Sequence, residues 1–98
     1  MQTLTTTIKR QWLAQIVAGT KKVEYREVKP YWVERFAKYT LPFKLRMING
    51  MSKKAPEVTC LIEKVEICSS AIEGVFYCLH ISKVLSYKNW DKKRGTPK

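Results

Sequence analysis

The apolar residues of one ten-residue stretch, "VTCLIEKVEI" (58–67), change parity partway along it. Val58, Cys60 and Ile62 share one parity, whereas Val65 and Ile67 share the other. Because side chains alternate between the two faces of a strand, one face stays buried only if an extra residue is inserted near Glu63 and Lys64. Such a bulge bends the strand, and bends of this kind let a small sheet curl toward closure. The stretch therefore predicts a curled sheet.

The rest of the chain alternates between short strand and helix patterns. Strands are predicted over 3–8, 22–28, 43–48, 58–67 and 74–85, with a projecting loop over 49–57. Apolar residues at helical spacing predict two short helices, over 9–18 and 30–39. This order favours an α+β domain, either a curled sheet or a small curled β-barrel of five or six strands, with two short helices. Residues 1–90 form a single domain in this interpretation, and residues 91–98 form a basic tail that frays.

Several residues mark the ends and the buried faces of the helices. Thr7 is the expected N-cap of the first helix, and Gly19 is the residue type that ends helices in the left-handed conformation. Pro30 suits the first position of the second helix. Trp12 and Trp32 lie on the apolar stripes, which predicts that both indoles belong to the core.

The charge balance is strongly positive. The chain has 98 residues, and 19 Lys and Arg against 8 Asp and Glu give a net charge of +11. Such an excess favours polyanions, above all nucleic acid, through neutralised phosphates and released counterions. An anionic membrane surface would need a basic amphipathic helix or a lipid anchor, and the sequence offers neither. The N-terminus lacks the pattern of a secretion signal, so a cytoplasmic location is expected.

The cysteines and the histidine predict no metal site and no cofactor. Cys60, Cys68 and Cys78 match no metal-ligand spacing, and we expect all three to be reduced, with thiols buried as small hydrophobes. The single histidine, His80, has no partner at ligand spacing, which favours a packed or hydrogen-bonded strand residue.

The segment "GTKKVEYR" (19–26) places several charges on one side of a predicted strand. Lys22, Glu24 and Arg26 share one face, and Lys21 follows the helix end and can reach the same place. From spacing alone two interpretations stay open. In the first, the charges are a solvent-exposed row of ion pairs that contributes little to stability. In the second, two cations flanking a carboxylate hold a phosphate while the carboxylate accepts a hydrogen bond from a base.

The arrangement "LAQIVAGTKKVEYREVKPYWVERF" resembles the ASCH domain family, a branch of the PUA-like β-barrels. The family signature is a short helix followed by Gly-x-Lys-x-x-Glu-x-Arg, which stands here as Gly19, Lys21, Glu24 and Arg26. The strings "KPYW", "INGMSKKAP" and "HISKVLSYKNW" are similar to a subgroup of small single-domain proteins of bacteria and their phages. The resemblance covers almost the whole chain.

Two positions depart from that subgroup. Ile48 stands where the subgroup has an arginine, and Met51 replaces an aromatic residue. The resemblance implies a PUA-like barrel with a cleft beside the first helix, lined by the Lys, Glu and Arg of the motif. Family members are thought to bind RNA or other nucleic acid, and one branch hydrolyses an acylated cytidine nucleoside.

The leading hypothesis is a module that binds RNA or single-stranded nucleic acid. Lys21, Glu24 and Arg26 form its central cleft, holding a base and a phosphate. Six residues are expected at the rim, with Tyr31 as the stacking candidate: Lys9, Tyr31, Asn49, Ser52, Lys53 and Lys54.

Two other functions stay open. A hydrolase acting on an acylated or otherwise modified cytidine would use Lys21 and Glu24 as catalytic residues, although Glu24 stands where the deacylating branch has a threonine. A second carboxylate would come from Glu63, Glu66 or Glu73. A domain that binds a protein partner would instead be marked by an exposed apolar patch.

Overall fold

The computed structural model describes residues 1–98 and shows an α+β fold. Its elements are β1 (Thr3–Thr7), α1 (Arg10–Ala18), β2 (Val23–Glu27), α2 (Pro30–Ala37), β3 (Phe43–Ile48), β4 (Glu57–Ser70), β5 (Gly74–Lys88), β6 (Trp90–Asp91) and β7 (Thr96–Pro97). The first five strands form one mixed sheet in the order β1-β3-β4-β5-β2, with β1 parallel to β3 and the other pairs antiparallel. β1 and β2 are its two edges and do not pair, so the sheet is not closed into the expected barrel.

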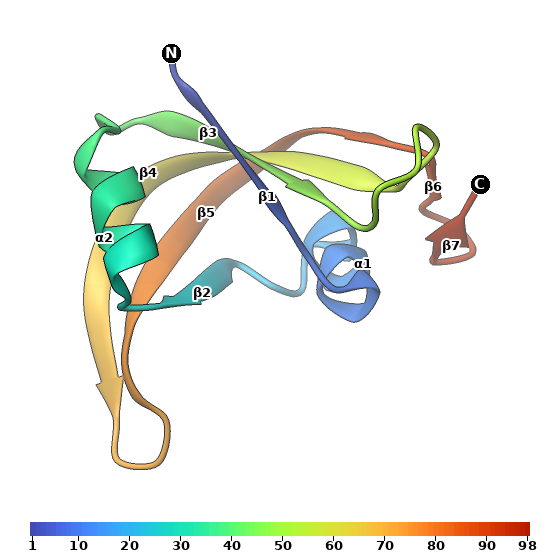
Figure 1. Ribbon diagram of the computed structural model, residues 1–98. Coiled ribbons are helices and arrows are strands. Elements are labelled where there is room, and N and C mark those ends of the chain that lie inside the picture. Colours follow the sequence, from blue (N-terminus) through green and yellow to red (C-terminus); the bar gives the residue numbers. More distant parts are fainter.

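The predicted bulge in β4 is confirmed. Ile62 pairs with Ile81 and Lys64 pairs with His80, so Glu63 has no partner residue on β5. Further register shifts occur at Thr59/Cys60 and Leu61/Ile62. Figure 1 shows β4 and β5 as two long curved ribbons that end in a projecting hairpin. The bulge is therefore a point where this long pair changes direction.

The core lies between α1 and the sheet. Leu13, Ile16 and Val17 of α1 are buried, together with apolar residues of β1, β3, β4 and β5. Gly19 ends the helix with φ +85°, the left-handed conformation that glycine adopts without steric cost. Trp12, predicted to be in the core, is instead 38% exposed, because it lies at the border of the apolar stripe.

The N-terminal end of each helix follows an extended lysine. Lys9 is the N-cap residue of α1 and makes no side-chain capping bond, so the predicted cap at Thr7 is wrong: Thr7 is the last residue of β1. Pro30 opens α2 as predicted. No residue of α2 is fully buried, and Trp32 and Phe36 pack against the edge of the core.

The tail from Asp91 has regular structure where fraying was expected. β6 and β7 pair as a short antiparallel hairpin, in register Trp90↔Pro97 and Asp91↔Thr96. Trp90 is buried in the core cluster and anchors the start of this hairpin.

Two of the three cysteines are paired, contrary to expectation. Cys68 on β4 and Cys78 on β5 form a disulfide with a Cα–Cα distance of 6.1 Å. Cys78 lies opposite Glu66 in the strand register, so it is a diagonal neighbour of Cys68. A count of cysteines could not reveal this, because it depends on the register of the hairpin. Cys60 is free and buried, as predicted.

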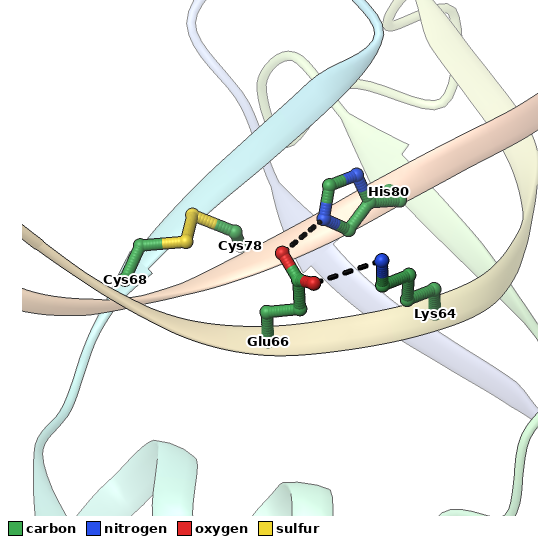
Figure 2. The surroundings of a disulfide bond; sticks show 5 residues. All are labelled: Lys64, Glu66, Cys68, Cys78 and His80. Carbon is green, nitrogen blue, oxygen red and sulfur yellow. Dashed lines mark hydrogen bonds and ion pairs between the residues drawn. A yellow bond between two sulfur atoms is a disulfide. The ribbon is translucent and has the colours of Figure 1, made fainter.

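An ion-pair cluster lies beside the disulfide (Figure 2). Glu66 accepts from Lys64 at 2.8 Å and lies 3.0 Å from Nε2 of His80. Lys64 first, and then His80, hold the pKa of Glu66 below its ordinary value. His80 is thus a hydrogen-bonded strand residue, as the sequence predicted.

Candidate functional site

The charged face of β2 points inward. Glu24 is only 5% exposed, and Arg26 is partly buried, while Tyr25 between them is exposed. A strand with the pattern Val-Glu-Tyr-Arg-Glu would ordinarily bury its apolar face. Here the charged face is buried instead, and this is tolerated because the buried carboxylate has cationic partners.

Glu24 is held by two cations and a main-chain donor. Arg26 Nη2 donates to Glu24 Oε2 at 2.7 Å, and Lys21 Nζ lies 3.7 Å from Oε1. The main-chain N–H of Tyr25 also donates to Oε1 at 3.2 Å. Three motif residues, Lys21, Glu24 and Arg26, therefore converge as the sequence predicted, and together they carry a net charge of +1.

Arg26 joins the two edges of the sheet. Its Nη2 donates to the main-chain carbonyl oxygen of Thr7, at the end of β1, over 2.9 Å. Its guanidinium carbon lies 5.3 Å from the ring centre of Trp32. Both hydrogen bonds use Nη2, and the buried Nε has no partner in the protein. Nη1 makes neither of these hydrogen bonds, so its donors are left for a ligand.

The three charges border a hollow of about 680 Å³ between α1 and β2. Its walls come from β1, α1, β2 and the β4–β5 turn, namely Thr7, Ile8, Lys9, Trp12, Lys21, Glu24, Tyr25, Arg26 and Glu73. We call it the first hollow. Lys21 Nζ lies 5.2 Å from the ring centre of Trp12 and 4.9 Å from that of Tyr25. One ammonium group thus lies close to two exposed aromatic rings.

A second hollow of about 580 Å³ lies on the other side of Arg26. Its lining comes from β1, β2, α2 and the loop after β3, namely Thr5, Thr6, Thr7, Arg26, Tyr31, Trp32, Ile48, Gly50, Met51 and Ser52. Tyr31 is 58% exposed there, and its hydroxyl accepts from Arg35 Nη1 at 2.7 Å. Lys9 and Tyr31, both predicted rim residues, therefore lie in different hollows.

The loop after β3 is brought to the site only in part. Ser52 lines the second hollow, and its hydroxyl accepts from the main-chain N–H of Lys54 at 3.1 Å. Lys53 and Lys54 are exposed and line neither hollow. Asn49 has a structural role instead: its side chain donates to the Ile8 carbonyl oxygen at 2.9 Å.

Sequence reasoning missed two residues, one that lines the first hollow and one that contacts the aromatic residues of the second. Trp12 was assigned to the core but lines the first hollow, and its position at the edge of the α1 stripe was the available signal. Arg35 contacts Tyr31 and Trp32 and donates to the Thr5 carbonyl oxygen, a contact between α2 and β1 that no local pattern indicates.

The pKa of the free thiol of Cys60 is affected by the nearby negative charge of Glu24. Burial, and then the negative charge of Glu24, raise the pKa of Cys60 to about 12. The thiol is therefore protonated at neutral pH and serves as a core residue rather than a nucleophile.

Exposed aliphatic side chains gather near the end of the β4–β5 hairpin. Ile67, Ile72 and Val75 are all more than half exposed. This is the feature expected of a protein-docking domain, although nothing in the structure indicates what would cover it.

Comparison of the chain with protein families, with curated proteins and with solved structures found no match. Neither helix has the length and apolar character needed to cross a bilayer.

Proposed function

We propose that the protein binds RNA or another single-stranded nucleic acid, with a base and a phosphate held at Lys21, Glu24 and Arg26. The observation that carries this proposal is the convergence of these three side chains beside two exposed aromatic rings, Trp12 and Tyr25. Cations beside stacking platforms are the usual means of binding single strands without a duplex groove.

Each group has a distinct role in this proposal. Arg26 and Lys21 attract the phosphate, and Glu24 keeps the two cations together at the floor of the first hollow. Glu24 Oε1 has a long contact with Lys21 and one bond from a main-chain N–H. A carboxylate oxygen with spare lone-pair capacity can accept from the exocyclic amine of a base such as cytosine. Trp12 supplies the surface on which that base stacks.

Binding of labelled single-stranded RNA and DNA, followed by fluorescence anisotropy across a salt series, tests the proposal. Affinity should fall steeply between about 50 and 200 mM salt, as counterion release requires. Arg26→Ala should weaken binding about tenfold or more and lower the salt slope by about 1. Absence of binding at low salt would refute the proposal.

A matched control separates the site from the general positive charge. Arg94 has a side chain that is 82% exposed, in the β6–β7 turn, and Arg94→Ala removes the same charge. We expect it to weaken binding less than Arg26→Ala does. Equal losses would mean that net charge, not this cleft, holds the ligand. Circular dichroism would verify that both variants are folded.

A hydrolase acting on an acylated or modified cytidine is the second candidate. It is favoured by one observation: Glu73 lines the first hollow and so supplies the second carboxylate that this reaction would need. Glu24 would activate water and Lys21 would stabilise the oxyanion. Ultraviolet absorbance of acylated cytidine during incubation tests this candidate. Turnover abolished in Glu24→Gln would support it, and no turnover by the parent protein would exclude it.

The fold family and the cellular location are also proposals. We infer a PUA-like domain of the ASCH family from the motif Gly19-Lys21-Glu24-Arg26 and the bend in β4. A cytoplasmic location stays a prediction, and the Cys68–Cys78 disulfide weighs against it because such bonds are more usual in oxidising compartments.

A further inference from the structure

The two hollows are neighbours that share two residues. Only Thr7 and Arg26 line both of them. These two are hydrogen-bonded to each other, Arg26 Nη2 to the Thr7 carbonyl oxygen, at 2.9 Å. The bond between the edge strands is therefore the ridge that separates the hollows.

Each hollow has its own aromatic surface. The first has the exposed rings of Trp12 and Tyr25, and the second has Tyr31, whose ring lies 5.1 Å from that of Trp32 at 79°. Both volumes lie in the range of about 300–1,000 Å³ that is usual for small-molecule sites. Either hollow is thus large enough for a base and provides a ring for it to stack on.

The ridge itself is cationic. Arg26 uses Nη2 for both of its hydrogen bonds, and its guanidinium carbon lies 5.3 Å from the ring centre of Trp32. Nη1 has no acceptor in the protein, and the side chain remains 19% exposed. An anionic group that bridges the two hollows would meet this donor.

We propose that the site takes a two-nucleotide single-stranded segment, with one base in each hollow and the connecting phosphate on Arg26. A phosphodiester places its charge between two bases, which matches a cationic ridge between two aromatic hollows. This inference rests on the proposed nucleic-acid function and specifies the length of ligand that the site recognises.

Isothermal titration with cytidine monophosphate, the dinucleotide CpC and the trinucleotide CpCpC, in ribo and deoxy forms, tests the inference. The second nucleotide should strengthen binding about 5- to 150-fold over the monophosphate, the value of one stacked base, and the third nucleotide should add little. The ribo and deoxy series show whether the 2′-hydroxyl contributes.

Variants of Tyr31 test whether the second base stacks on this ring in the second hollow. Tyr31→Ala should bring the affinity for CpC down to that for the monophosphate. Tyr31→Phe, which keeps the ring, should retain the higher affinity for CpC. Tyr87→Ala removes another exposed tyrosine, one that lies outside both hollows, and should change nothing. Equal affinity for one and two nucleotides would overturn this inference while leaving the proposed function intact. So would a higher affinity for CpC than for the monophosphate that persists in Tyr31→Ala. Binding of none of the probes would overturn both.

Discussion

Arg26 on β2 donates a hydrogen bond to the main-chain carbonyl oxygen of Thr7 on β1, so one side chain links the two unpaired edges of the sheet. The same nitrogen also donates to Glu24. Exposed strand edges invite pairing with other chains, and a side chain that occupies an edge carbonyl limits this. The residue at the centre of the proposed site is thus also part of the structure that shapes it.

Glu24 and Arg26 should be energetically coupled. Arg26→Met leaves a buried carboxylate with only the main-chain N–H of Tyr25 and the longer contact to Lys21, so we expect a loss of about 3 kcal/mol in the free energy of unfolding. Glu24→Gln/Arg26→Met should lose less than the sum of the single changes, by at least about 1 kcal/mol. Urea unfolding of the four proteins measures this.

The exposed pair Glu27–Lys29 is the control for this comparison of single and double variants. Its atoms lie 3.0 Å apart, but the side chains of Glu27 and Lys29 are 73% and 62% exposed, and coupling below about 0.5 kcal/mol is expected. Additive losses at Glu24 and Arg26 would show that their contact does not stabilise the fold.

Acid should weaken the link between β3 and β4. Arg46 donates to Glu57 at 2.6 and 3.1 Å and holds the pKa of Glu57 below its ordinary value of 4.5, although partial burial opposes this shift. A lowered pKa in the folded state stabilises the protein above the unfolded-state pKa. This contribution is lost as pH falls through the folded-state pKa.

Unfolding of the Glu57→Gln variant tests this pH dependence. At neutral pH the variant should be less stable than the parent by less than about 1 kcal/mol, because the Arg46 side chain is 42% exposed and solvent screens the pair. The difference should shrink as the pH falls below the unfolded-state pKa of Glu57. A difference that stays constant across this range would mean that the ion pair contributes nothing to stability.

The three cysteines should differ in reactivity. Without reductant, iodoacetamide should leave the native protein unmodified, because Cys60 is buried and the pKa of its thiol is raised to about 12. Denaturation should expose one reactive thiol per chain, and reduction followed by denaturation should expose three. Mass spectrometry counts the labels, and three labels before reduction would contradict the Cys68–Cys78 bond.

Gly19 should tolerate few replacements. Nothing lies within 4 Å of an added Cβ, so the cost of Gly19→Ala comes from its φ of +85° and should be about 1 kcal/mol. Gly19→Asn should cost less, since asparagine enters this conformation more easily. Thermal unfolding of both variants measures the difference, and an equal loss would point to a cause other than backbone conformation.

Local patterns predicted much of the fold. The strand 43–48 is observed with those bounds, and the parity change in β4 located the bulge at Glu63 because burial imposes a strict period of two on a strand. The convergence of Lys21, Glu24 and Arg26 was also predicted from spacing and resemblance.

Contacts between distant segments escaped prediction. Nothing in β2 alone shows that its charged face is the buried one, because the partner of Arg26 is a carbonyl oxygen of β1. The barrel was inferred from the bend in β4, but closure also requires β1 and β2 to pair, and they do not. The Cys68–Cys78 bond likewise depends on hairpin register, which the sequence did not specify.

Titration of the isotopically labelled protein with CpC, followed by amide chemical shifts, tests the central claim most directly. The account predicts that the largest shifts fall on the amides of residues 21–26 and on Thr7 and Trp12, around the Arg26 ridge. Shifts confined to the β6–β7 hairpin or to the exposed lysines 53 and 54, with residues 21–26 unmoved, would contradict it.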